Sequence, residues 1–117
     1  MLKKEAAYYI ANSGILNSSQ QKKKQTAIED LIVERGLQIS ESHKFIDTEY
    51  ELPALNRLIK TAERNEFKNI IVYALSDLGH SSDEMWEIIS LIESYGSTII
   101  SVTDIRDTDE PLTREVN

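Results

Sequence analysis

The sequence contains no cysteine among its 117 residues. Neither a disulfide framework nor a thiolate metal site can form, which fits a cytosolic protein, and we expect a cytoplasmic location. No apolar run approaches the roughly 20 residues of a membrane-spanning helix, and the start, MLKKEAAYYIANS, has too short an apolar part for a signal peptide. These absences exclude a disulfide-stabilised secreted domain, and we expect no contact with a membrane.

Glycine, proline and positive charge are also scarce. With 4 Gly, 2 Pro and 40% hydrophobic residues, the composition is that of an ordinary globular protein. A chain of 117 residues suffices for one domain that buries roughly two-thirds of its extended surface. The net charge of −7 argues against unaided binding to nucleic acid, because phosphate contacts need clustered basic residues and only residues 22–24 provide a cluster. We therefore expect a single domain over residues 1–117, with weak or absent DNA binding.

Strand-like and helix-like segments alternate along the chain. Apolar runs predict strands near residues 7–11, 70–74 and 98–102, with a weaker one within 37–46. Apolar residues at helical spacing predict helices near residues 19–35, 52–65 and 81–95. Gly36 and Gly96 follow the first and the last of these helices, and Pro53 begins the middle one. The alternation predicts a three-layer α/β domain with a mainly parallel sheet of four to five strands, the 70–74 run in its interior, and helices on both faces.

The stretch ALSDLGHSSDE, residues 74–84, follows the clearest predicted strand. Ligands of α/β proteins gather beyond the carboxyl ends of such strands. However, Ser81 and Glu84 have the spacing of a helix capping box. The remaining polar residues, Ser76, Asp77 and His80, lie too close together on one loop for a hydrolytic triad. We interpret the stretch as turn, cap and surface residues, with adaptation to a small ligand as the alternative.

The histidines and the third predicted helix give weaker indications. His43 and His80 lack a recognisable ligand spacing, so we expect neither a metal ion nor a cofactor. Trp86 is interpreted as a helix-packing residue rather than a platform for stacked bases. The apolar face of this helix is formed by Met85, Ile88, Ile89, Ile92 and Tyr95. Trp86 and Leu91 lie off that face, which makes them a candidate contact surface.

Several segments together resemble the catalytic domain of the serine recombinases, the resolvase and invertase family. YYIANS, residues 8–13, falls where that family has Tyr-x-Arg-Val-Ser, and GLQISESHKFIDTEYE matches its second strand and the link that follows. Residues 52–104 resemble its proline-started helix, apolar strand, Lys-Leu-Asp-Arg-Leu-x-Arg loop, helix and Ser-Val-Thr strand. DTDEPLTRE resembles Asp-Thr-x-x-Pro-x-Gly-Arg, with Thr113 where glycine is usual. The resemblance implies a resolvase-like N-terminal domain with Ser13 at the position of the nucleophile.

The family's catalytic arginines have no counterpart in this sequence. In the resemblance, Ala11 and Leu52 occupy the positions of two arginines, and Asp77 and His80 occupy those of the two in the loop. Attack of a serine on a DNA phosphodiester without metal requires guanidinium groups to meet the charge that grows on the phosphoryl oxygens. A carboxylate at residue 77 would instead repel that charge. We therefore expect an inactive Ser13, which would serve as a polar turn residue.

Three functions are open at this point. The favoured one is a catalytically inactive serine-recombinase-like module of regulation or protein interaction, of mobile-element or prophage origin. The second is a site-specific DNA recombinase fragment that cuts and joins DNA through Ser13, and the third is a small-ligand domain. Because the sequence ends at Asn117, where the family's long oligomerisation helix begins, we expect no helix-turn-helix DNA-binding domain. We expect association with a second copy, in a symmetric homodimer, or with a related recombinase-fold protein.

Overall fold

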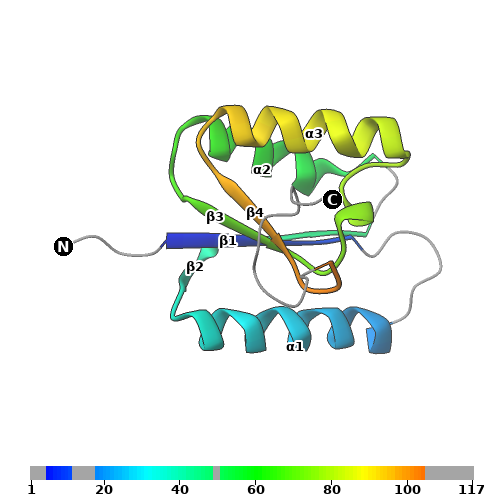
Figure 1. Cartoon of the computed structure of the whole chain (residues 1–117). Coiled ribbons are helices and arrows are strands. Elements are labelled where there is room, and N and C mark those ends of the chain that lie inside the picture. Colours follow the sequence, from blue (N-terminus) through cyan, green and yellow to red (C-terminus); the bar gives the residue numbers. More distant parts are fainter. Residues whose placement is uncertain (1–4, 12–17, 49–50, 105–117) are drawn as a thin grey trace, which may run out of the picture.

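Three layers make up the protein, with a parallel sheet between helices (Figure 1). The computed structural model describes residues 5–11, 18–48 and 51–104. Its strands are β1 (Glu5–Ala11), β2 (Gln38–Asp47), β3 (Asn69–Val72) and β4 (Thr98–Ser101). Its helices are α1 (Ser18–Arg35), α2 (Pro53–Glu63), the short 3-10 helix η1 (Leu75–Asp77) and α3 (Ser82–Ser94). Helix α1 covers one face of the sheet, and α2 and α3 cover the other.

The strand order is β2-β1-β3-β4, and all three pairings are parallel. The two interior strands are apolar on both faces, as expected for strands covered by helices on each side. Tyr9 and Val72 pack with the residues of α2 and α3, whereas Tyr8 and Ile71 pack with Ile28 of α1. The predicted fold class and the interior position of the 70–74 run are confirmed, although β3 already ends at Val72.

The pairing of β2 with β1 is irregular. Ala6 lies opposite Ile39, but Tyr8 lies opposite Lys44, so the register shifts between these two pairs. The intervening part of β2 is largely exposed, and its polar sequence, Ser-Glu-Ser, carries no apolar alternation. A shift of this kind bends a strand and interrupts its pairing. The same polar run left few apolar positions within residues 37–46, so the strand signal there was weak.

The helix ends follow the predicted local chemistry with small differences. Helix α1 ends at Gly36, where φ is 67°, and the Leu37 amide donates to the Ile32 carbonyl at 3.0 Å. Helix α2 ends at Glu63 rather than at residue 65, because Asn65 adopts a positive φ of 59°. None of the helices in the described part of the chain combines the length and apolar character that crossing a membrane requires.

Candidate functional site

The loop that follows β3 lies at the carboxyl ends of the parallel strands, as its position in the sequence predicts. Asp104, just beyond β4, fastens this loop to the neighbouring strand. Its Oδ2 accepts a hydrogen bond from the Leu75 amide at 3.1 Å and another from the Ser101 hydroxyl at 2.8 Å. The start of η1 is therefore held at the end of β4 by a single carboxylate.

Lys24 of α1 supplies a cation to this edge of the sheet. Its Nζ lies 3.3 Å from each carboxylate oxygen of Asp77 and donates to the Ala11 carbonyl oxygen at 3.0 Å. It also lies 5.8 Å from the centre of the Tyr73 ring. The side chains of Lys24 and Asp77 expose only 15% and 14% of their surfaces, so this ion pair is largely shielded from solvent. Lys24 thus joins α1 to the ends of β1 and β3.

Asp77 occupies an environment that opposes its charge. Burial raises the pKa of the Asp77 carboxyl, while the Lys24 ammonium acts in the opposite direction. Asp77 lies in the turn η1, as expected, but the expectation of a surface role is wrong for this residue, because its carboxylate is largely buried and pairs with Lys24 of α1. The pairing partner was missed, although Lys24 precedes buried Ile28 by one helical turn, whereas Lys22 and Lys23 do not.

The second half of the loop begins helix α3. The Ser81 hydroxyl accepts a hydrogen bond from the Glu84 amide at 3.1 Å, which confirms the predicted N-cap. The Glu84 carboxylate reaches back to the amide of His80 at 2.8 Å, one residue earlier than in the usual capping box. The Asp77 side chain therefore pairs with α1, whereas the backbone amide of His80 is bound by Glu84 of α3. Ser76 is exposed.

Asp47, at the end of β2, is a buried carboxylate that the sequence did not indicate. Its two oxygens accept hydrogen bonds from the Ala54 amide at 2.6 Å and the Leu55 amide at 2.8 Å, in the first turn of α2. The Tyr9 hydroxyl donates to it at 2.7 Å. Burial, together with this hydrogen bond and the Asp47 charge, raises the pKa of the Tyr9 hydroxyl, so it keeps its proton. Asp47 performs from a distance the capping that Leu52, the residue preceding α2, cannot provide.

Of the other predicted site positions, the structure brings one to the Lys24–Asp77 pair and places another in the core. Ser13 lies outside the described residues. Ala11 ends β1, and its carbonyl binds Lys24, so Ala11 and Asp77 are brought together. Leu52 is 6% exposed, packs in the core under α2 and α3, and has a φ of 54°, which is unusual for a residue with a branched side chain. Leu52 is therefore a core residue rather than one that faces a ligand.

Comparison with models of protein families shows to which family the chain is related. The family described as "Resolvase, N terminal domain" matches residues 12–116. The chain belongs to the resolvase family. This assignment confirms the family resemblance found in the sequence. Among curated proteins, none is significantly similar to this resolvase domain in sequence.

Solved structures similar to the resolvase domain include catalytic domains of recombinases and an integrase. The N-terminal catalytic domain of TP901-1 integrase has a TM-score of 0.73 and 21% identity, with 86% of this chain and 78% of that one covered. The C-terminal catalytic domain of ISC1926 TnpA, an IS607-like serine recombinase, has a TM-score of 0.73 and 16% identity, covering 86% and 70%. A resolvase family site-specific recombinase from Streptococcus pneumoniae has a TM-score of 0.73 and 12% identity, covering 94% and 79%. Identities this low establish a shared fold.

His43 of the resolvase domain is a structural residue. Its ring is buried, with Nδ1 lying 3.3 Å from the Ser40 hydroxyl and Nε2 lying 3.4 Å from the Glu66 carboxylate. It also meets the Phe67 ring edge-on at 5.1 Å. Arg64 and, secondarily, His43 hold the pKa of the Glu66 carboxyl below its ordinary value. Within residues 5–11, 18–48 and 51–104, no group of three or more acidic or histidine side chains is placed to hold a metal ion.

Trp86 and Leu91 lie on the solvent side of α3, as predicted. Ile88, Ile89 and Ile92 of this helix are buried, whereas Trp86 is 55% and Leu91 is 40% exposed. The interpretation of Trp86 as a packing residue is wrong, since more than half of its surface is open. The third large exposed apolar residue of the described chain, Val33 on α1, was not singled out in the sequence.

Proposed function

We propose that this resolvase domain is a catalytically inactive, serine-recombinase-like module that acts through protein contacts. The observation that carries the proposal is the ion pair of Lys24 and Asp77 at the carboxyl ends of β1 and β3. Asp77 stands where the sequence resemblance places an arginine that would bind the attacked phosphate. A DNA phosphate approaching this loop would meet a carboxylate in place of a guanidinium group.

Lys24 is poorly suited to replace the missing arginine. Its ammonium already contacts both oxygens of Asp77 and the carbonyl of Ala11. To bind a phosphate, it would have to leave a carboxylate that is largely shielded from water, and an unpaired buried charge is costly. An ammonium also lacks the planar, bidentate geometry with which arginine grips a phosphoryl group. The local cation therefore stabilises the fold and is not presented to DNA.

The size of the expected defect can be estimated from single losses. Removal of one preorganised donor to a developing oxyanion costs roughly 3 kcal/mol, or about a hundredfold in rate. Four arginine positions are replaced in the resemblance: Ala11, Leu52, Asp77 and His80. Even with strong non-additivity, the combined loss amounts to many powers of ten. Any residual cleavage activity would fall below the detection limit of an ordinary cleavage assay.

A supercoiled-plasmid assay tests this proposal. We expect the purified protein to leave the plasmid supercoiled and to form no covalent complex with DNA, and we expect Ser13→Ala to behave identically. A covalent adduct that forms with the wild type and disappears in Ser13→Ala would overturn the proposal. That result would favour a recombinase fragment that cuts and joins DNA through Ser13.

Binding to duplex DNA gives a separate test of the acidic-surface argument. At near-physiological salt, we expect a dissociation constant of about 10⁻⁴ M or weaker, because a chain with a net charge of −7 is repelled by DNA and has few clustered cations to displace its counterions. Fluorescence anisotropy with a labelled duplex would measure it. Saturable binding below about 1 µM under these conditions would contradict the expectation.

A further inference from the structure

The outer face of α3 combines exposed apolar groups with one sign of charge. Trp86 and Leu91 are separated by about 140° around the helix, and Asp83 and Glu87 project between them. The helix contains four acidic residues, Asp83, Glu84, Glu87 and Glu93, and no lysine or arginine. A symmetric pairing of two α3 helices would bring these carboxylates together, and like charges in contact are unfavourable. The charge of this face therefore favours a basic partner.

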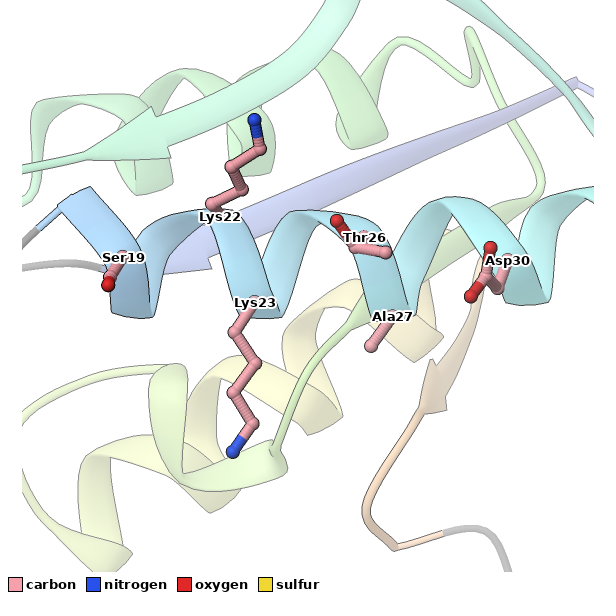
Figure 2. A pocket seen from close by; sticks show the side chains of 6 residues that line it. All are labelled: Ser19, Lys22, Lys23, Thr26, Ala27 and Asp30. Carbon is pink, nitrogen blue, oxygen red and sulfur yellow. The ribbon is translucent and has the colours of Figure 1, made fainter.

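The outer face of α1 has the opposite character over its first half. An open hollow of about 490 Å³ is lined by Ser19, Lys22, Lys23, Thr26, Ala27 and Asp30. The two lysine side chains extend toward opposite sides of the helix, and the shorter side chains of Thr26 and Ala27 lie one turn further along it (Figure 2). Neither lysine forms an ion pair or a side-chain hydrogen bond with any described residue. Both ammonium groups are thus available to an acidic partner.

We propose that these two faces bind each other between separate copies of the protein, with α3 of one copy seated on α1 of the next. Trp86 would enter the hollow above Thr26 and Ala27, while Asp83 and Glu87 would meet Lys22 and Lys23. A lysine beside the indole ring would add a cation–π contact. Asp30, at the far end of the hollow, favours a register in which the acidic residues of α3 lie over the lysines.

The contact must be intermolecular, because α1 and α3 cover opposite faces of the sheet (Figure 1). Each copy therefore carries the acidic face on α3 and the basic face on α1. Such a head-to-tail contact does not close on itself as a two-fold dimer does, so it can add further copies. This inference rests on the proposed role in protein contacts, and it names a different arrangement from the symmetric pairing expected from the sequence. It does not depend on whether Ser13 is active.

Two complementary variants test the contact. Lys22→Glu/Lys23→Glu reverses the charge of the α1 face, and Trp86→Ser/Glu87→Gln removes the indole and one carboxylate from the α3 face without adding a positive charge. All four residues are exposed, so both variants should fold. In sedimentation at tens of micromolar, we expect the wild type to exceed its monomer mass of 13.3 kDa and each variant alone to be monomeric. An equal mixture of the two should form a one-to-one dimer, since the first keeps α3 and the second keeps α1. Added salt should weaken both associations.

A charge control separates this contact from a general effect of net charge. Lys60→Glu/Lys68→Glu changes the charge of the chain by the same amount as the α1 variant, but at two exposed lysines outside α1 and α3, and it should associate as the wild type does. Three results would overturn the proposal: a monomeric wild type, self-association of either face variant at the wild-type level, or a mixture that stays monomeric. No DNA is present in these measurements, so their failure is distinct from that of the proposed function.

Discussion

A single carboxylate, that of Asp47, joins the end of β2 to β1 and to the start of α2. The first amides of any helix lack partners within the helix, and a negative charge at that end also meets the positive end of the helix dipole. Leu52 cannot provide either, because its side chain is apolar and lies in the core. One buried acid therefore replaces an ordinary N-cap residue and fixes where α2 begins.

Asp47→Asn should be among the most destabilising conservative changes in the chain. Its amide would point N–H groups at the Ala54 or Leu55 amide, so we expect a loss of roughly 2–4 kcal/mol in the free energy of unfolding. Tyr9→Phe removes only one hydrogen bond to the same carboxylate and should cost about 1 kcal/mol. Urea denaturation of both variants would measure the difference. Equal losses would show that the contacts with α2 contribute nothing beyond the Tyr9 contact.

Lys24→Met should destabilise the protein in a way that depends on pH. At pH 7 we expect a loss of roughly 1–3 kcal/mol, since the Asp77 carboxylate would stay shielded without its cation. The pKa of Asp77 is already raised by burial, so its ionisation reduces stability as the pH rises from the unfolded pKa through the folded one. Without Lys24 the pKa of Asp77 rises further. The loss of stability in the variant therefore grows as the pH rises. As the pH falls toward pH 4 the carboxyl gains its proton, so the deficit should become smaller than at pH 7.

Denaturation midpoints at pH 4 and pH 7 would check this expectation. Lys23→Met, which removes an exposed lysine of the same helix, should change stability little at either pH. Asp77→Asn combined with Lys24→Met should recover part of the loss at pH 7, because no charge is then left unpaired. A deficit of Lys24→Met that is the same at both pH values would instead assign the effect to lost packing against Tyr73.

Helix ends show which local signals were sufficient. The boundaries of α1 and α3 agree with the prediction within a residue or so because Gly36 and Ser81 act through their own backbone or side chain. The start of α2 agrees because proline fits the first helical turn. Its true cap, Asp47, precedes the helix by several residues and acts through tertiary structure, which local pattern cannot reveal. The irregular pairing of β2 was likewise invisible, because register depends on the partner strand.

Gly36→Ala tests the end of α1. At φ 67° an alanine is strained, but its added carbon would meet no atom within 4 Å, so the cost is that of the backbone alone, about 1 kcal/mol. Gly36→Asn should cost less, because asparagine tolerates this conformation better. Thermal unfolding of the two variants would rank them. If alanine were no worse than asparagine, the hydrogen bonds at residues 36 and 37 would not depend on the left-handed turn.

At the scale of the whole molecule, the alternation of apolar strands and amphipathic helices determined the layers, the parallel sheet and the side on which the loop of residues 74–84 emerges. The sequence could not show which side chains meet at that edge, because Lys24 and Asp77 lie on elements that are distant in the chain and adjacent only in the fold. The charge of the two outer helix faces was present in the sequence as well. Its significance required knowledge that α1 and α3 lie on opposite sides of the sheet.

The central position of β1 also determines how the chain must fold during synthesis. β1 leaves the ribosome before the other strands and pairs with β2 on one edge, but its other edge is filled by β3, which is made only after α2. Until then, the backbone of β1 and apolar residues such as Ala7 stand open beside a half-built core. A chain stopped at residue 66, which lacks β3, α3 and β4, should therefore fail to fold cooperatively and should aggregate or bind chaperones. A chain that extends through β4 should acquire resistance to proteolysis, and limited proteolysis of stalled nascent chains would show whether protection first appears once β3 has emerged.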